Sequence, residues 1–445
     1  MSGNMRTQSS ILDLNETLNE SDRSLNLREM YNYEYFERDY NHGQSSQLEL
    51  MDNARTSSNI PLSLNFNAID HYRDNVMRDQ HVVAEDIENG DQANYGFVDE
   101  WQFEHHEGVN ERIFNYVFWT FKPCVDGFRY CRPVILIDGT HVYGKYDIKL
   151  LIAVAAHESL DTWTKFLSDL HQHVMRGRQG ITLISDRHHD ILGSVSTEHN
   201  WQASFAYQRY CLRHLKANCQ RTYKSVRLNN LLWAAANATQ EKKFLLQMEL
   251  IKETHFPAYE WLMNIDLEKR TIHKDNGRRW GMLITNSSES FNGMLKSARG
   301  LPVTAMVKMP YSMIVDRFVQ RSKYAKQLLT DKQKWMPNPF KKFEEYRKKA
   351  SMHSIQNYLV TDNIFEVRTF NSHHGKGGNK QIVNETQRAC TCEKWQSNHF
   401  PCSHIIRVFE FVGNPAWDYI AFEFSMAWYK KAYSGQLIPL GDEDY

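Results

Sequence analysis

Long apolar runs and a secretory leader are both missing from this sequence of 445 residues. No run approaches 18 apolar residues, which argues against a membrane-spanning helix and predicts no membrane partner. The start of the chain lacks the basic-then-apolar pattern of a secretory signal. We therefore expect a reducing, intracellular setting, in which the seven cysteines are metal ligands or core residues rather than disulfides.

Lysine is also absent from the first 100 residues, although the whole chain is neutral with 53 basic and 53 acidic side chains. Residues 1–100 hold 7 arginines against 19 acidic residues, a net charge of −12. Residues 296–350 carry 14 basic and 4 acidic side chains, a net charge of +10. A basic segment of this kind can attract a polyanion, or its lysines can simply cover a solvated helix face.

A cluster of metal-ligand residues stands near the carboxyl end, in a C-x-C, nine residues, C-x-H array. The four positions are Cys390, Cys392, Cys402 and His404. Thiolates and imidazole suit tetrahedral Zn²⁺, and four protein ligands leave no position for a reactive water. We therefore predict one structural zinc ion. The alternative is a chance cluster of buried thiols and a core histidine.

The zinc-binding segment is short. About 35 residues cannot bury enough apolar surface to fold alone, so we expect metal binding to supply much of the folding free energy. Trp395 and Phe400 lie between the ligands. We read them as the small core of this finger rather than as platforms for base stacking.

Apolar runs predict the strands of an α/β domain. Residues 132–140 and 149–155 are expected to pair as a hairpin, and residues 180–186 form another buried strand. Apolar residues at helical spacing predict a helix through 160–170, capped by Ser159 or Asp161. The stretch from about 211 to 261 is helical in pattern throughout, and QIVNE predicts a strand leading into the zinc ligands.

Three carboxylates occupy positions where α/β folds gather chemistry. Asp138 and Asp186 end apolar strands, and Glu289 begins a predicted helix. If they converge, they could hold two Mg²⁺ ions about 4 Å apart and support phosphodiester cleavage. Each also has an ordinary role: Asp138 beside Gly139 in a turn, Asp186 as a helix cap, and Glu289 in a capping box with Asn286.

Five motifs occur in an order that resembles the plant Mutator-like (MULE) transposases and their domesticated relatives. They are IDGTHVYGKY, LISDR, QRYCLRHLKAN, ITNSSESFNGMLKSARGLPV and CTCEKWQ…FPCSH. The resemblance covers roughly residues 97–440 and implies an α/β, RNase H-like domain with an all-helical insertion, followed by a small zinc-stabilised SWIM finger. It also implies that Asp138, Asp186 and Glu289 form the acidic triad. Cys211 and His214 match the family's C-x-x-H pattern, either as ligands of a second metal or as strand-end core residues.

These considerations divide the chain into six parts. We expect residues 1–95 to be a largely disordered acidic region. The other parts are an aromatic-rich entry segment at 96–131, the RNase H-like domain at 132–300 with its insertion at about 212–275, a basic helical segment at 301–375, the SWIM finger at 376–415 and a tail at 416–445.

The chain departs from the family pattern in three ways. The domain is shortened near residues 155–162, where relatives carry an additional edge strand. An upstream DNA-binding zinc module is not recognisable in residues 1–95, and the chain stops at Tyr445, close behind the finger. These departures indicate an eroded element-derived gene or an imperfectly assigned one.

The sequence therefore predicts a nuclear zinc-binding protein, derived from a Mutator-like transposase with eroded catalysis, that contacts DNA or proteins through its finger and basic segment. Its oligomeric state cannot be read from these residues. The alternatives are an active DDE-type transposase, which alone would need Mg²⁺, and a transcriptional regulator resembling the far-red-response family. The residues assigned to phosphate contact are Lys296, Arg299, Arg317, Arg321, Lys323 and Lys326.

Overall fold

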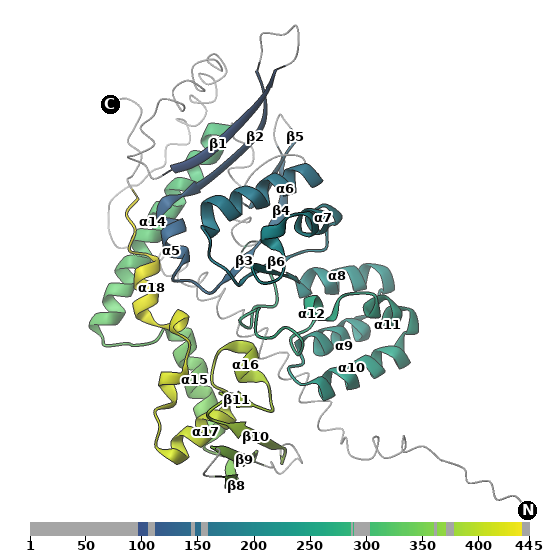
Figure 1. Ribbon diagram of the computed structural model, residues 1–445, viewed down its shortest axis with the longest axis vertical. Coiled ribbons are helices and arrows are strands. Elements are labelled where there is room, and N and C mark those ends of the chain that lie inside the picture. The colour runs from purple at the N-terminus through teal and green to yellow at the C-terminus, as the bar shows by residue number, and fades with distance from the viewer. Residues whose placement is uncertain are drawn as a thin grey trace, which may run out of the picture. The chain divides into compact units, whose positions relative to one another are not determined.

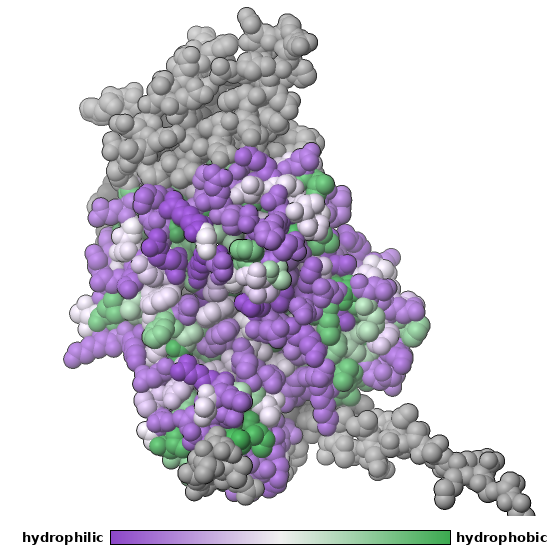
Figure 2. All heavy atoms as spheres, in the orientation of Figure 1, coloured by the Kyte–Doolittle hydropathy of each residue, from purple (hydrophilic) through white to green (hydrophobic). Residues whose placement is uncertain are grey.

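The computed structural model is drawn in Figure 1. It describes residues 97–105, 112–143, 147–152, 159–285, 288, 303–359, 363–370 and 378–437. Several predictions fall outside these ranges: the disorder of residues 1–95, residues 155–158 of the shortened segment at 155–162, Glu289, Lys296 and Arg299. Within the described ranges, no helix is long and apolar enough to cross a membrane. The face drawn in Figure 2 is mostly hydrophilic, with apolar side chains scattered across it.

A three-stranded parallel sheet forms the centre of the α/β part, in the order β3-β6-β7. Its strands are β3 (Val134–Leu136), β6 (Ile181–Ser185) and β7 (Ala206–Tyr210). All five residues of β6 are buried, as expected for a continuous apolar run between two neighbouring strands. Ile137 extends β3 by donating its amide to the carbonyl of Ile184 at 3.0 Å.

Two antiparallel hairpins accompany this sheet. The first joins β4 (Asp138–Tyr143) to β5 (Asp147–Ile152), so the predicted pairing of 132–140 with 149–155 holds for residues 138–140, whereas residues 134–136 pair with β6. The second joins β1 (Phe97–His105) to β2 (Arg112–Phe121) in the aromatic-rich entry segment. Because only Ile137 separates β3 from β4, one extended stretch pairs first with β6 and then with β5.

Helices α6 (Leu160–Asp169) and α7 (His189–Thr197) lie close to the sheet (Figure 1). Ser159 caps α6 by accepting a hydrogen bond from the Thr162 amide at 3.2 Å, so the first of the two predicted caps is the one used. The core beneath includes fully buried Phe166, Leu167 and Ile181. Three shorter pieces complete this part: α5 (Lys122–Phe128), a π-helical turn (Leu170–Met175) and a 3₁₀ turn (His199–Trp201).

Helices alone fill the chain between β7 and residue 270. They are α8 (Leu212–Tyr223), α9 (Val226–Asn237), α10 (Glu241–Thr254), α11 (Phe256–Met263) and α12 (Leu267–Arg270). They group together beside the strands in Figure 1. Their buried apolar positions, among them Leu232, Phe244 and Ile251, recur at helical spacing, which is why the pattern was readable from the sequence.

The basic segment expected to be helical over 301–375 is helical only as far as Ala350. Helices α14 (Val303–Thr330) and α15 (Pro337–Ala350) are followed by strands β8 (Ser354–Leu359) and β9 (Ile364–Arg368). In β9 the side chains of Phe365 and Val367 are buried and their neighbours are not, which is the two-residue period of a strand.

These two strands belong to the sheet of the finger, in the antiparallel order β11-β10-β9-β8. Strand β10 (Lys380–Asn384) coincides with the predicted QIVNE strand, and β11 (Ala389–Cys390) carries the first cysteine of the array. Helices α16 (Lys394–Asn398) and α17 (Ser403–Val412) follow.

The segment called a tail is folded over its described part. It contains two 3₁₀ turns (Ala416–Tyr419 and Phe422–Phe424) and helix α18 (Met426–Ala432). Helix α18 packs on α14, where Arg321 donates to the hydroxyl of Tyr429 at 3.0 Å and Phe318 meets the Tyr433 ring edge to face. Aromatic and apolar residues in this stretch thus fill gaps between earlier elements.

Candidate metal centre

Two neighbouring turns bring the four predicted zinc ligands together. Cys390 ends strand β11, and Cys392 follows just before a backbone kink at Glu393, whose φ is 59°. Cys402 is the N-cap of α17, and His404 lies in the first turn of that helix. Cys402 therefore stands at the positive end of the helix dipole, which favours negative charge, although burial raises the pKa of its thiol overall.

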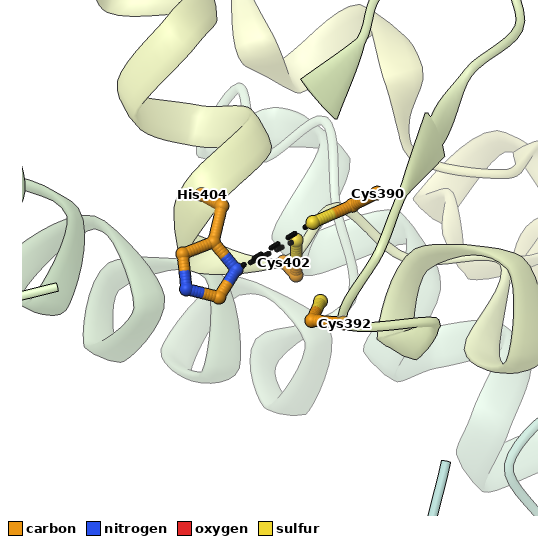
Figure 3. A group of neighbouring side chains, drawn as sticks. All are labelled: Cys390, Cys392, Cys402 and His404. Atoms are coloured by element: carbon orange, nitrogen blue, oxygen red, sulfur yellow. Dashed lines mark hydrogen bonds between the residues drawn. The ribbon is translucent and has the colours of Figure 1, made fainter. Parts of the chain in front are cut away.

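The geometry of the four side chains fits a tetrahedral ion (Figure 3). One donor atom from each residue lies within 4.8 Å of all the others, and the three cysteines are buried. The Nδ1 atom of His404 is 3.6 Å from the sulfur of Cys390 and 3.7 Å from that of Cys402. Ligand bonds of about 2.0 and 2.3 Å in a tetrahedron give a nitrogen–sulfur edge of about 3.5 Å, close to both distances. Imidazole Nδ1 is thus the atom placed to bind the ion.

The ionisation of the three thiols is mutually dependent. Hydrogen bonding from Cys390 and Cys402 holds the pKa of Cys392 well below its usual value. The pKa of Cys390 is raised, chiefly by that same bond to Cys392, and burial raises the pKa of Cys402. The protein alone therefore favours one thiolate, whereas a divalent cation at the centre stabilises all three.

Two further residues hold the ligands in place. Gln396 fixes Cys390 from both sides, donating to its carbonyl at 2.9 Å and accepting from its amide at 3.3 Å. His353, in the turn before β8, stacks on His404 with ring centroids 5.1 Å apart and shares a 3.0 Å hydrogen bond with Ser403. Burial lowers the pKa of His353 to about 4, so this ring is neutral near pH 7 and does not repel a cation. His353 lies outside the spacing pattern of the four ligands, so no local motif pointed to it.

The core around the site is larger than the finger itself. Trp395 and Phe400 are buried in it, as predicted, at 5% and 2% exposure. It also takes in Trp335 and Phe343, from before and within α15, and it extends beyond the finger to Ile420. We expected metal binding to supply much of the folding free energy of a segment of about 35 residues. The finger instead shares a core with neighbouring elements, so apolar burial outside that segment also stabilises it.

Two of the predicted carboxylates follow neighbouring strands of the parallel sheet. Leu136 of β3 pairs with Ile184 of β6, and Asp138 and Asp186 each come two residues further along the chain. The Asp186 Oδ1 atom accepts from the His188 amide at 3.1 Å, but His188 is itself the N-cap of α7 and that helix has no side-chain cap, so Asp186 does not take the predicted capping role. The third carboxylate, Glu289, lies outside the described residues.

Cys211 and His214 sit at the same edge, at the start of α8. Burial raises the pKa of the Cys211 thiol, but hydrogen bonding and charge from His214 outweigh it, so the net shift is downward. The Cys211 sulfur also accepts a 3.3 Å hydrogen bond from Thr285. Among described residues this pair belongs to no group of three or more metal donors.

A second donor group comprises His188, His189 and Asp190. The two imidazoles already flank the Asp190 carboxylate, at 3.5 and 3.1 Å, and His189 is 84% exposed. These contacts account for the group as polar side chains in contact with one another at the start of α7.

The predicted phosphate-contact residues separate into two kinds. Lys323 and Lys326 are exposed on α14. Arg317 and Arg321 are half-buried, and Arg321 is engaged with Tyr429. Lys296 and Arg299 lie outside the described residues.

Comparison with known proteins identifies one part of the chain. Residues 376–413 match the SWIM zinc finger family. No curated protein and no solved structure matches the chain. Together with the Cys₃His cluster, this match points to a bound zinc ion in a mixed α/β protein with a carboxyl-terminal SWIM finger.

Proposed function

We propose that this chain is a nuclear zinc-binding protein derived from a Mutator-like transposase, with an RNase H-like domain, and that it binds DNA through its finger and basic segment. The observation that carries the ancestry is the alignment of chemistry-bearing residues along one edge of the sheet. Asp138, Asp186 and Cys211 each follow the carboxyl end of one of the three neighbouring strands β3, β6 and β7.

The return of the chain after the helices supports the same proposal. Leu212 donates its amide to the Leu283 carbonyl at 2.9 Å, and Thr285 reaches the Cys211 sulfur. Helices α8 to α12 therefore leave the sheet edge and the chain comes back to it, as an insertion would. Ser288 donates to the Thr285 carbonyl at 2.7 Å, so the described chain up to Ser288 stays near this edge of the sheet.

The DNA-binding part of the proposal rests on charge. The exposed lysines of α14 and the last turn of α15, which holds Arg347, Lys348 and Lys349, can neutralise phosphates. Binding driven by counterion release weakens steeply with salt, with a slope of about 0.9 in log affinity per phosphate contact.

The experiment measures duplex affinity against salt for the full chain and for Lys323→Glu/Lys326→Glu. We expect this double variant to lower the slope by about 1.8, which corresponds to two phosphate contacts. Lys242→Glu/Lys243→Glu, which makes the same charge change on the exposed start of α10, is the control and should leave the slope unchanged. Absent or salt-insensitive binding would contradict the proposal and point to a protein partner.

Active DDE-type cleavage is the second candidate, favoured by the positions of Asp138 and Asp186 after neighbouring strands of the parallel sheet. It requires Mg²⁺-dependent nicking or strand transfer that disappears in Asp138→Asn, Asp186→Asn and Glu289→Gln. Asp161→Asn, in the first turn of α6, is the acidic control and should retain any activity. If no tested DNA end yields a Mg²⁺-dependent product, DDE-type cleavage is excluded and DNA binding remains as the proposed function.

A further inference from the structure

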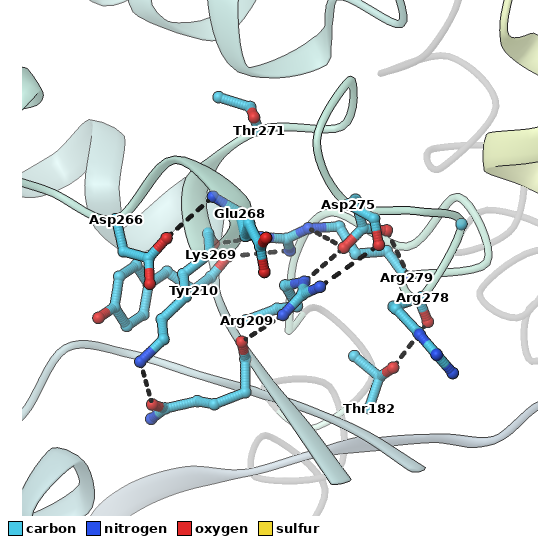
Figure 4. Close-up of polar contacts among 12 residues, drawn as sticks. Thr182, Arg209, Tyr210, Asp266, Glu268, Lys269, Thr271, Asp275, Arg278 and Arg279 are labelled. Atoms are coloured by element: carbon cyan, nitrogen blue, oxygen red, sulfur yellow. Dashed lines mark hydrogen bonds and ion pairs between the residues drawn. The ribbon is translucent and has the colours of Figure 1, made fainter. Parts of the chain in front are cut away.

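A loop of the α/β part, residues 271–285, is anchored rigidly to strand β7 (Figure 4). Asp275 accepts from the guanidinium of Arg209 at 2.5 Å and from the amide of Arg279 at 2.6 Å. Arg279 also donates to the Tyr210 carbonyl at 3.0 Å. All three charged side chains are at most 4% exposed, so the loop presents a fixed surface rather than a pliable one.

The zinc-bearing loop of the finger rests on this surface. His399, which lies between the second and third cysteines, shares a 2.9 Å hydrogen bond through Nε2 with the Gly277 carbonyl. Its ring also stacks on Trp280, with centroids 4.0 Å apart and planes at 22°. One residue of the finger is thus held by both a polar and an aromatic contact.

Two glycines permit this close approach. A β-carbon at Gly277 would lie 2.5 Å from the Gln396 carbonyl oxygen and 3.0 Å from His399 Nε2. A β-carbon at Gly281 would lie 2.7 Å from the Asn398 side-chain oxygen. Both glycines have φ of +74°, a conformation that side chains rarely adopt. The backbone of the α/β loop is therefore in direct contact with helix α16.

A second contact joins the finger to the turn between α9 and α10. Thr239 donates through its hydroxyl to the carbonyl of Cys392 at 2.8 Å. Gln240 donates to the carbonyl of Thr391 at 2.9 Å. These acceptors belong to the first zinc-ligand turn itself, so the turn that binds the metal also binds the helical part of the chain.

We propose that the zinc loop of the SWIM finger is an internal docking element whose conformation, set by the metal, orders residues 271–285 and the α9–α10 turn. On the finger side, all of the contacts come from residues 391–399, which follow the first ligand, Cys390, and precede the third, Cys402. Two of these residues, Glu393 and His399, have left-handed backbones. A bound ion fixes that backbone, and its loss frees it. The surface thus covered is closed to other partners. This inference requires zinc but does not depend on a role in DNA binding.

Hydrogen–deuterium exchange of the full chain, with zinc bound and after chelation, tests the linkage. We expect exchange in peptides covering 271–285 and 236–241 to accelerate about tenfold on chelation, equivalent to ~1.4 kcal/mol of local stability. Strand β6 is the internal reference and should be unaffected. Acceleration confined to residues 378–413 would overturn the proposal.

A glycine pair supplies matched variants. Gly277→Ala forces a clash at the contact, whereas Gly177→Ala imposes a similar backbone strain, at φ of +78°, with nothing within 4 Å of the new β-carbon. We expect Gly277→Ala to retain one zinc per chain and yet to exchange faster in both 271–285 and 394–399. Gly177→Ala should also retain its zinc, and its exchange in both segments should be unchanged. Equal behaviour of the two variants would contradict the docking role.

Thr239→Val removes the second contact without changing side-chain size much, and it keeps the test decisive if Gly277→Ala fails to fold. The valine variant should accelerate exchange in the α9–α10 turn and in residues 389–394 while zinc stays bound. Unchanged exchange at both places would show that the contact at Cys392 carries no coupling. Zinc content, measured in every variant, separates a failure of docking from a failure of metal binding.

Discussion

The metal centre and the acidic sheet edge assemble their chemistry in opposite ways. The four zinc donors all come from one short segment, Cys390 to His404, so two turns suffice to bring them together. At the sheet edge, Asp138 and Asp186 follow two strands that are far apart in the chain and pair in parallel register. The first site therefore depends on local backbone and metal, and the second depends on the integrity of an entire core.

The sharpest way to break this comparison is to remove one zinc ligand. Cys402→Ala should abolish stoichiometric zinc and unfold the finger locally, since structural zinc sites bind with about 10–16 kcal/mol and that energy is folding energy. Cys219→Ala is the matched control: this cysteine is also fully buried but stands in α8, outside the cluster. Elemental analysis and thermal melting report both effects. Retained zinc in Cys402→Ala would refute the ligand assignment.

The stability of the sheet region is tested at the buried ion pairs among Arg209, Asp275 and Arg279. Asp275→Asn removes the negative charge that the guanidinium groups of Arg209 and Arg279 share, and we expect a loss of about 3–5 kcal/mol in unfolding free energy. Lys122→Ala breaks an exposed pair with Asp126 and should cost less than about 1 kcal/mol. Denaturant unfolding measures both. Similar costs for the two variants would mean that the network contributes no more than a surface pair.

Core substitutions of identical chemistry compare the two regions directly. Ile406→Val in the finger and Ile181→Val in the sheet each remove one methylene from a residue with 0% exposure, so each should cost about 0.5–1.5 kcal/mol. Ile406→Val should also keep its zinc. A negligible effect of Ile406→Val beside a clear effect of Ile181→Val would indicate that metal alone, without the shared core, maintains the finger.

The smallest effect at neutral pH is expected at His273, which stacks on Phe244 with centroids 4.2 Å apart. Burial, followed by the charge of Lys274, lowers its pKa from 6.5 to about 4. The unfolded chain therefore takes up the proton first, so stability is fully present above about pH 6.5 and is lost as pH falls toward 4.

His273→Phe preserves the aromatic stack and removes the titration. The variant should match the wild type near pH 7 and should lose less stability between pH 6.5 and 4. Denaturant unfolding at several pH values measures this difference, and because both proteins carry the same finger, acid release of zinc affects them equally. Parallel pH profiles for the two proteins would contradict the assigned pKa shift.

Much of the local structure was predictable because short-range signals determine it. Apolar runs located β6 and part of the β4–β5 hairpin, and helical spacing located α6 and the helices α8 to α11. The strands β8 and β9 were missed because lysines before them suggested a continuing helix, and because the sheet that they join is completed by β10, which pairs with β9 from further along the chain. Strand pairing over such distances leaves little trace in sequence.

In the candidate metal centre, too, the features set by local sequence were predictable and those set by packing between distant elements were not. The spacing of the four zinc donors could be read directly, and the SWIM match covers the same residues. His353 could not be found, because its contact with His404 arises only when α15 packs against α17. The docking of His399 on Trp280 was equally hidden, since it joins two parts of the chain whose patterns are independent.

X-ray absorption at the zinc edge, combined with elemental analysis of the purified full chain, tests the central claim most directly. One zinc per chain is expected, with three sulfur neighbours at about 2.3 Å and one nitrogen neighbour at about 2.0 Å. A chain that carries no stoichiometric zinc, or a zinc surrounded only by oxygen and nitrogen, would contradict it.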